Sequence, residues 1–356
     1  MPAADLQPSA AGEAAAAGAA PLPAADCQPQ LPALAPGAAP PAPPAPAPPS
    51  LPSIDASAFY REYKGHLVPH LAAVHAGLLA QSREAFVFLC GDSSLDNKHW
   101  FFGACPQPFV AAANGMERLL EPPHSIPDVA HCLNALLAAS AAPLRLACIN
   151  GAVEESALHE RSRGVLLKQD AWVAATAGPR DAIVVCCGGN DVVLKPLPDT
   201  VQALLALLTR STPASLADGS APGLDHFVRL FRDQLGDFVR RLCANRPRLC
   251  IVCMVYYPQL SSLGAASWAS HSLGQMGYTQ RPELLQSIIR AVYQHGVRAL
   301  AAPEGTRVVP LPLFEVLDPA SGADYLQRVE PSRQGGEKMA AAILRVVQQE
   351  FGGASV

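Results

Sequence analysis

The apolar and polar positions of this chain alternate between short apolar runs and longer stretches of helical period. Five runs are short, rich in apolar or β-branched residues and nearly free of charge, at residues 85–90, 144–149, 182–187, 249–255 and 307–311. Runs of this length and composition are typical of strands that are buried on both faces. They predict five strands of one sheet.

The stretches between these runs repeat apolar residues every three or four positions. Helical patterns cover residues 58–82, 127–140, 225–244, 282–300 and 336–351. The pattern is clearest in 225–244, which contains Phe227, Leu230, Phe231, Leu235, Phe238 and Leu242. Uncharged strands that alternate with helices predict an α/β fold, a three-layer α/β/α sandwich around a mostly parallel five-stranded sheet.

Residues 1–53 differ from the rest, with 19 Ala and 15 Pro and with no aromatic residue, Lys or Arg. Such a segment buries too little apolar surface to offset the entropy of ordering, so we expect a disordered tail. It lacks the features of a secretory signal or a transit peptide. We expect one folded domain over residues 54–356 and no transmembrane segment, because no apolar stretch reaches about 18 residues.

The net charge of −4 and the lack of a basic run argue against a nucleic-acid partner. Six of the ten cysteines lie in or beside predicted strands, where a free thiol acts as a small hydrophobe: Cys90, Cys148, Cys186, Cys187, Cys250 and Cys253. Residues three apart in a strand point to opposite faces, so Cys250 and Cys253 should not meet. We expect free thiols, a reducing, cytoplasmic setting and no metal or cofactor.

Two predicted strands end in tight polar turns. Ser93 lies in a Gly-Asp-Ser turn after the first run, and Asn190 lies in a Gly-Gly-Asn-Asp turn after the third. In open parallel sheets, functional sites form beyond the carboxyl ends of the strands. Ser93 is therefore a candidate nucleophile, and the Asn190 amide is a candidate hydrogen-bond donor to an oxyanion.

In this order the turns resemble the motifs of the SGNH (GDSL-type) hydrolases. Asp92, Ser93 and Asp96 match the first block, residues 150–152 (Asn-Gly-Ala) resemble the second, and Asn190 matches the third. The resemblance implies an SGNH hydrolase-like (flavodoxin-like) fold and a serine esterase that acts on small-molecule or lipid acyl esters. The oxyanion donors that it implies are Ser93, Gly151, Ala152 and Asn190. Ala152 stands where the family usually has glycine.

The last block departs from the family, which carries Asp-x-x-His-Pro-Ser before the final helix. Residues 327–332 read Gln-Arg-Val-Glu-Pro-Ser, so that Gln327 replaces the acid and Glu330 replaces the histidine base. Three alternatives remain open. Glu330 acts as the base with a raised pKa, supported by Gln327. A loop histidine serves instead, with His99, His124 and His271 as candidates. In the third, the protein is a catalytically impaired pseudo-enzyme or a ligand-binding protein.

Two long connections, residues 100–143 and 256–281, are expected to cover the site. Within the second, Tyr256, Tyr257 and Pro258 directly follow a predicted strand, and either a pocket wall or core packing is expected of them. Glu154 and Glu155 follow the second block and are expected at a solvated helix start, with a place in the pocket lining as the alternative. Together these patterns favour an ester hydrolase and leave the identity of its base open.

Overall fold

The computed structural model describes residues 51–105, 107–140, 145–161, 164–261 and 267–352. The tail that the sequence predicts to be disordered lies outside these residues except for its last three positions. The described chain enters the fold through the short strand β1 (Ile54–Asp55), which pairs with β4 (Leu120–Glu121).

The central sheet has five parallel strands in the order β6-β2-β7-β8-β9. They are β2 (Ala85–Gly91), β6 (Leu146–Asn150), β7 (Ala182–Cys186), β8 (Leu249–Met254) and β9 (Arg307–Pro312). Every residue of β2, β6, β7 and β8 is buried, which explains their continuous apolar runs. All five predicted strands are confirmed.

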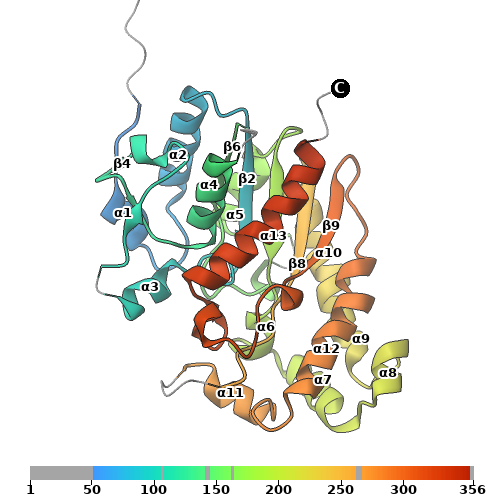
Figure 1. The fold of residues 1–356 in the computed structure, drawn as a ribbon. Helices are drawn as coiled ribbons and strands as arrows, with labels where there is room; N and C mark the ends of the chain where they lie inside the picture. Colours follow the sequence, from blue (N-terminus) through green and yellow to red (C-terminus); the bar gives the residue numbers. More distant parts are fainter. Residues whose placement is uncertain (1–50, 106, 141–144, 162–163, 262–266, 353–356) are drawn as a thin grey trace, which may run out of the picture. The chain divides into compact units, whose positions relative to one another are not determined.

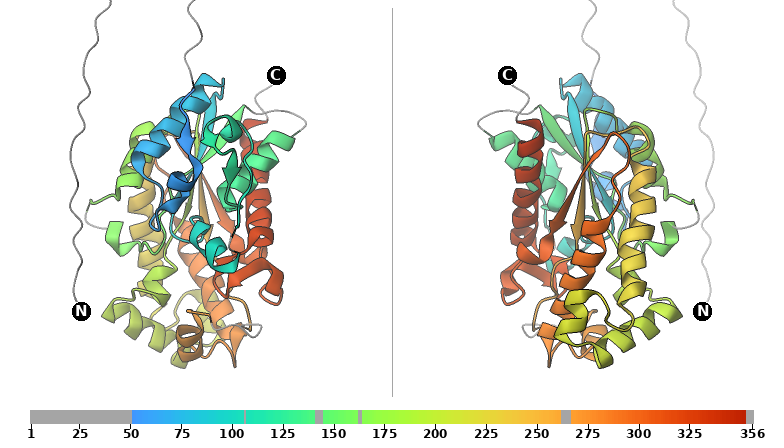
Figure 2. Two further views of the ribbon diagram at one scale, coloured as in Figure 1. Left: turned by 90° about the vertical axis from the view of Figure 1, so that its left-hand side faces the viewer. Right: turned by 90° about the vertical axis from the view of Figure 1, so that its right-hand side faces the viewer.

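Helices cover both faces of this sheet, as Figure 2 shows. α4 (Val129–Ala139) and α13 (Arg333–Phe351) pack against each other on one face. The opposite face carries α2 (Val68–Ala80), α5 (Lys168–Thr176), α10 (Leu235–Leu242) and α12 (Pro282–His295). The predicted three-layer α/β/α architecture is therefore confirmed.

The thiols of Cys250 and Cys253 belong to different apolar cores, one on each face of the sheet. This confirms that the two side chains point apart. The nine cysteines in the described ranges are all free. Within those ranges, no helix combines the length and the apolar content needed to cross a membrane.

Two helical regions differ from the sequence pattern. Residues 58–82 form two helices, α1 (Ala56–Arg61) and α2, and Pro69 lies in the first turn of α2. Residues 225–244 form a continuous run of α9 (Leu224–Val228), the π-helical segment η3 (Arg229–Gln234) and α10. The π turn brings Phe231 against Gly188, where an added Cβ would lie 2.7 Å from the Phe231 ring.

Further helices gather at the carboxyl end of the sheet, at the bottom of Figure 1. They are α6 (Asn190–Val193), α7 (Pro198–Arg210), α8 (Pro213–Asp218) and α11 (Ser270–Gln275). The remaining elements are α3 (Lys98–Ala104), β3 (Val110–Ala111), β5 (His124–Ser125), β10 (Tyr325–Gln327), β11 (Glu330–Pro331) and the 3₁₀ turns Met116–Arg118, His159–Arg161, Val297–Ala299, Leu313–Glu315 and Gly322–Asp324.

Candidate active site

The turn after β2 is fixed by its backbone. Gly91 has a φ of +130°, and a Cβ there would lie 1.7 Å from the Cys186 carbonyl oxygen, so only glycine fits. The Gly91 carbonyl oxygen accepts hydrogen bonds from Val153 N (3.0 Å), Ser156 Oγ (3.0 Å) and Arg161 Nη2 (2.9 Å). These contacts hold the turn that presents Ser93.

Ser93 meets Glu330 across this turn. Ser93 Oγ lies 3.5 Å from Glu330 Oε1, and Glu330 is fully buried. The residues on either side of Glu330 are held by hydrogen bonds. Asn97 Nδ2 donates to Pro331 O (2.9 Å), and Tyr256 OH donates to Val329 O (2.7 Å). The structure thus places a carboxyl group beside the candidate nucleophile.

A cavity opens beside this pair, with about 120 Å³ of space open to the centre of a water molecule. Asp92, Ser93, Asn190 and Glu330 line one part of it. The remaining walls are mostly apolar and come from α6, α7, α9, η3, α11 and α12. Tyr256 and Pro258 contribute to the wall as predicted, whereas Tyr257 stacks on Phe314 instead.

As far as the structure describes the two long connections, one of them reaches this cavity. Residues 256–281 supply Trp268, Leu273 and Met276 to its lining, which confirms their predicted position over the site. Those of residues 100–143 that lie in the described ranges contribute nothing to it. Trp268 is a lining residue that no sequence motif indicated, because tryptophan in a loop has no characteristic spacing.

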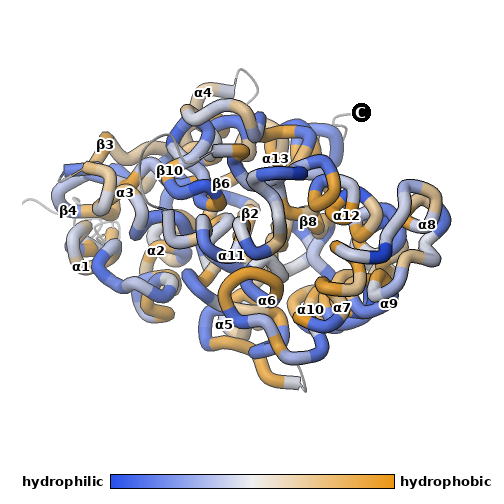
Figure 3. Tube along the Cα trace, turned by 90° about the horizontal axis from the view of Figure 1, so that it is seen from below, coloured by the Kyte–Doolittle hydropathy of each residue, from blue (hydrophilic) through white to orange (hydrophobic). Residues whose placement is uncertain are grey.

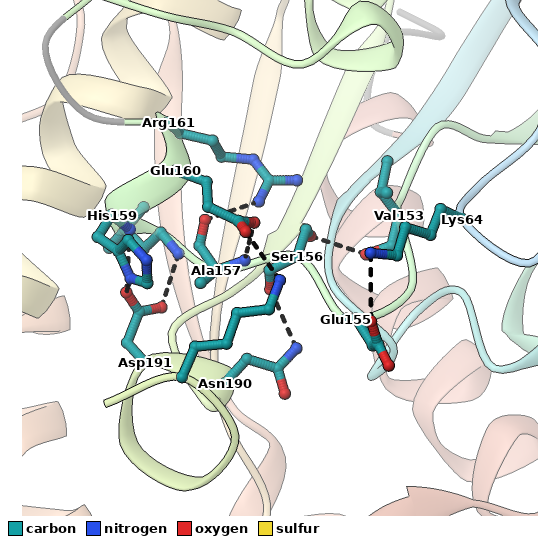
Figure 4. Close-up of polar contacts among 12 residues, drawn as sticks. Lys64, Val153, Glu155, Ser156, Ala157, His159, Glu160, Arg161, Asn190 and Asp191 are labelled. Carbon is teal, nitrogen blue, oxygen red and sulfur yellow. Dashed lines mark hydrogen bonds and ion pairs between the residues drawn. The ribbon is translucent and has the colours of Figure 1, made fainter. Parts of the chain in front are cut away.

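Asn190 begins α6 directly after β7, and Figure 4 shows its surroundings. Its Nδ2 donates to the Ser156 carbonyl oxygen at 3.0 Å. An amide nitrogen carries two hydrogens, so one remains for a ligand in the cavity. The Ser93 backbone N–H also has no acceptor in the part of the chain that the structure describes. Both groups are therefore suited to binding an oxyanion.

Gly151 and Ala152 do not line the cavity, and their N–H groups are engaged elsewhere. Gly151 N donates to Leu89 O (2.8 Å), and Ala152 N donates to Asn150 Oδ1 (3.0 Å). The side chain of Asn150 closes a local turn and thereby uses the N–H that the resemblance assigned to an oxyanion. We leave both residues out of the oxyanion hole proposed below.

The remaining predicted supporting residues lie at different places. Asp92 lines the cavity, and burial raises the pKa of its carboxyl to about 6. Asp96 is buried away from the cavity and pairs with the equally buried Lys98 at 2.6 Å. Gln327 pairs with Glu330 through the backbone. The side chains of Gln327 and Glu330, both in the described ranges, form no hydrogen bond with each other. Gln327 therefore does not orient the Glu330 carboxyl group.

All ten histidines lie in the described ranges, and none lines the cavity. His124 and His271 are exposed, and His99 is exposed at a separate surface pocket. His159 follows Ser156, the hydrogen-bond partner of Asn190, by a few residues in the chain. Its Nδ1 is 2.9 Å from Asp191 Oδ1 (Figure 4). Nothing in this arrangement supports a loop histidine as the base for Ser93.

The pKa of Glu330 is raised well above its usual range, mainly by burial and further by the charges of Glu154 and Asp92. Contacts with Ser93 and the Trp268 indole oppose this shift and favour the ionised form. Glu330 is therefore protonated in acid and becomes a base only as the pH rises through this elevated pKa.

Glu154 was expected at a solvated helix start, which is wrong. Its side chain is buried, its backbone N donates to Asp96 Oδ2 (2.9 Å), and burial raises its pKa to about 8. The indoles of Trp100 and Trp268 stack with ring centroids 6.4 Å apart and lie near Glu154 and Glu330, respectively. The charge of the buried Glu154 thus acts on Glu330, which lies against Ser93.

Replacing Glu154 by Gln should lower the pKa of Glu330, because a repelling charge is removed. The midpoint of the rise of kcat/KM with pH is then expected to move down by roughly one unit, as one nearby charge commonly produces. The measurement is a pH profile on an activated ester. Glu155→Gln is the matched control, since Glu155 pairs with Lys64 at 3.2 Å and does not line the cavity. An unchanged midpoint in Glu154→Gln would contradict the coupling.

No family model matches this chain, and neither does any curated protein. Among solved structures it is similar to an extracellular lipase from Streptomyces rimosus, with 14% identity over 75% of this chain and 99% of that one and a TM-score of 0.39. It is also similar to a carbohydrate esterase family 3 protein from Talaromyces cellulolyticus, with 14% identity over 76% and 100% and a TM-score of 0.35. Similarities at this level carry no argument about activity.

Proposed function

We propose that this protein is an SGNH-type serine ester hydrolase with Ser93 as nucleophile, Glu330 as general base and Asn190 in the oxyanion hole. The observation that carries the proposal is the distance of 3.5 Å between Ser93 Oγ and Glu330 Oε1. The pair lies at a cavity that Asn190 also lines. A nucleophile, a base and an oxyanion donor at one cavity are the minimum for acyl transfer.

In the first step, ionised Glu330 accepts the hydroxyl proton while Ser93 Oγ attacks the ester carbonyl carbon. The carbonyl oxygen becomes an oxyanion, which accepts hydrogen bonds from the Ser93 N–H and the Asn190 amide. The bond to the alcohol oxygen then breaks, and the alcohol takes the proton from Glu330. Water, deprotonated by Glu330, attacks the acyl-serine, releases the carboxylic acid and restores the Ser93 hydroxyl.

The raised pKa of Glu330 supports this role. A carboxylate of ordinary pKa is a weak base for a hydroxyl, whereas burial in this apolar site makes the ionised form more basic. The same shift keeps Glu330 protonated at low pH, where it cannot accept a proton. Activity should therefore rise with pH.

A ligand-binding protein without turnover is the second candidate. The observation that favours it is the replacement of the histidine base by a buried carboxyl group of raised pKa. Loss of an effective general base typically lowers the rate by about 10²–10⁴. Reactivity of Ser93 separates the two candidates.

A fluorophosphonate probe is expected to form one covalent adduct, at Ser93, and to react faster at alkaline than at acidic pH. Intact-protein and peptide mass spectrometry measure the adduct and its position. Ser94→Ala is the matched control and should still be labelled, whereas Ser93→Ala should not. If the wild-type protein neither forms the adduct nor hydrolyses acyl esters of varied chain length, the ligand-binding alternative is correct.

A further inference from the structure

We infer that the apolar part of the cavity beside Ser93 binds the hydrocarbon chain of a medium- or long-chain fatty acyl ester. For turnover, this inference rests on the proposed function. It goes beyond that function by naming the substrate class. The cavity's lining, its polarity and the surface beside it carry the inference.

The cavity is polar only around Ser93. Its two charged lining residues, Asp92 and Glu330, flank the serine or lie against it. The other walls carry Val192, Val193, Leu204, Phe227, Phe231, Leu273, Met276, Leu285, Ile288, Ile289 and Val292. Water needs two to four polar partners to be held in a cavity, and these apolar side chains supply none. The space suits a hydrocarbon chain.

This polarity also fixes the orientation of a bound ester. The carbonyl group belongs beside Ser93 and Asn190, and the acyl chain extends toward α12. A sugar in the apolar part would leave its hydroxyl groups without partners, which is costly. An acetyl group would leave most of the apolar space empty. The lining therefore favours a long acyl chain over acetylated carbohydrate.

Phe231, which lines the cavity, packs closely on Gly188. Gly188 has a φ of +113°, and an added Cβ would meet the Phe231 ring at 2.7 Å. The π-helical segment η3 brings Phe231 to this point, and such segments occur frequently at functional sites. Gly188 and Phe231 both line the cavity, so this close contact fixes one part of its wall.

The surface next to the cavity is apolar as well. Val193 and Leu204 line the cavity, and the residues that follow them, Leu194 and Leu205, are 37% and 61% exposed. Leu197 and Val201 are also exposed and share a face of α7 with Leu205, because the three are spaced four apart. α6 and parts of α7 are correspondingly coloured as hydrophobic in Figure 3. Exposed apolar residues that cluster mark contacts with apolar ligands or interfaces, and here Leu194 and Leu205 directly follow residues that line the cavity.

The test compares kcat/KM on 4-nitrophenyl acetate, butanoate and octanoate below their aggregation concentrations. Each methylene buried in the cavity should raise kcat/KM by up to about fourfold, so octanoate should exceed acetate at least tenfold. Leu204→Trp should fill the cavity and reverse the preference. Gln202→Trp places the same side chain on the exposed face of α7 and should leave it unchanged. Val292→Phe provides a second filling variant if Leu204→Trp fails to fold.

Binding is measured separately with the fluorescent fatty acid cis-parinaric acid on Ser93→Ala protein, which cannot turn over. Saturable binding that the filling variants weaken at least tenfold supports the inference, even if no ester is hydrolysed and the proposed function fails. Equal hydrolysis of acetate and octanoate, together with no parinarate binding, overturns the inference and leaves the proposed function standing. Absence of both hydrolysis and binding overturns both.

Discussion

Glu330→Gln should lower kcat/KM by at least about 100-fold and also make the protein more stable at neutral and alkaline pH. The loss follows from removing the base, which typically costs about 10²–10⁴ in rate. The gain follows because a fully buried carboxyl group with a raised pKa is costly to ionise, whereas a neutral amide of the same shape carries no such cost.

The pH dependence of this gain has a definite sign. The pKa of Glu330 is raised well above its ordinary value of 4.5, so the folded state holds a proton that the unfolded state releases. Glu330 therefore makes no difference to stability below about pH 4.5, and stability falls as the pH rises from there toward the elevated pKa. The melting temperature of Glu330→Gln should exceed that of wild type by at least about 2 °C at alkaline pH and match it in acid.

Thermal unfolding of both proteins across this pH range checks the stability prediction, and ester hydrolysis at the same pH values checks the activity. Glu155→Gln is the control, because Glu155 is partly exposed and its pKa is lowered by Tyr63 and Lys64. Glu155→Gln should show neither the loss of kcat/KM nor the gain in thermal stability. An unchanged kcat/KM in Glu330→Gln would remove Glu330 from the mechanism, whatever its effect on stability.

The sheet was predictable because strands that are buried on both faces consist of continuous runs of apolar residues. The parallel register then followed from the alternation with helices, and it brings the ends of β2 and β7 together, with Gly91 opposite Cys186. This local logic is why Ser93 and Asn190, each just beyond a strand end, line the same cavity. Glu330 was found through its position before Pro331-Ser332, where Ser332 caps α13 by accepting from Gly335 N.

The features that the sequence did not predict depend on contacts between distant segments. Glu154 has the sequence context of a surface residue, but Asp96 from the turn after β2 and Trp100 from α3 lie against it, and it is buried. The cavity lies among side chains of several helices that are far apart in the sequence. The spacing of apolar residues within one helix does not indicate whether a space remains between helices. The motif at residues 150–152 was recognised in the sequence, but a motif does not show which acceptors its N–H groups meet. Here Gly151 N donates to Leu89 O and Ala152 N donates to Asn150 Oδ1.

Arg161→Met should destabilise the folded protein by about 3–5 kcal/mol, the usual result of removing one partner of a buried ion pair. Arg161 is fully buried, and its Nε donates to the equally buried Asp170 Oδ2 at 2.8 Å. Its Nη2 donates to the Gly91 carbonyl oxygen at 2.9 Å, directly before the Ser93 turn. Methionine keeps the packing over Phe238 but leaves the Asp170 carboxylate without its cation. We expect kcat/KM to fall as well, because the turn loses a hydrogen bond.

Chemical denaturation of the variant, with ester hydrolysis under native conditions, measures both effects. Arg229→Met is the matched control, because Arg229 pairs with Asp225 at 2.6 Å while both side chains are more than half exposed. Exposed pairs contribute about 0–1 kcal/mol, so this control should change little. Adding Asp170→Leu to Arg161→Met should recover much of the stability, since the unpaired buried charge is then gone. It should not recover the activity, because the Gly91 carbonyl still lacks its donor. A loss in Arg161→Met no larger than that of Arg229→Met would show that this buried pair does not hold the Ser93 turn.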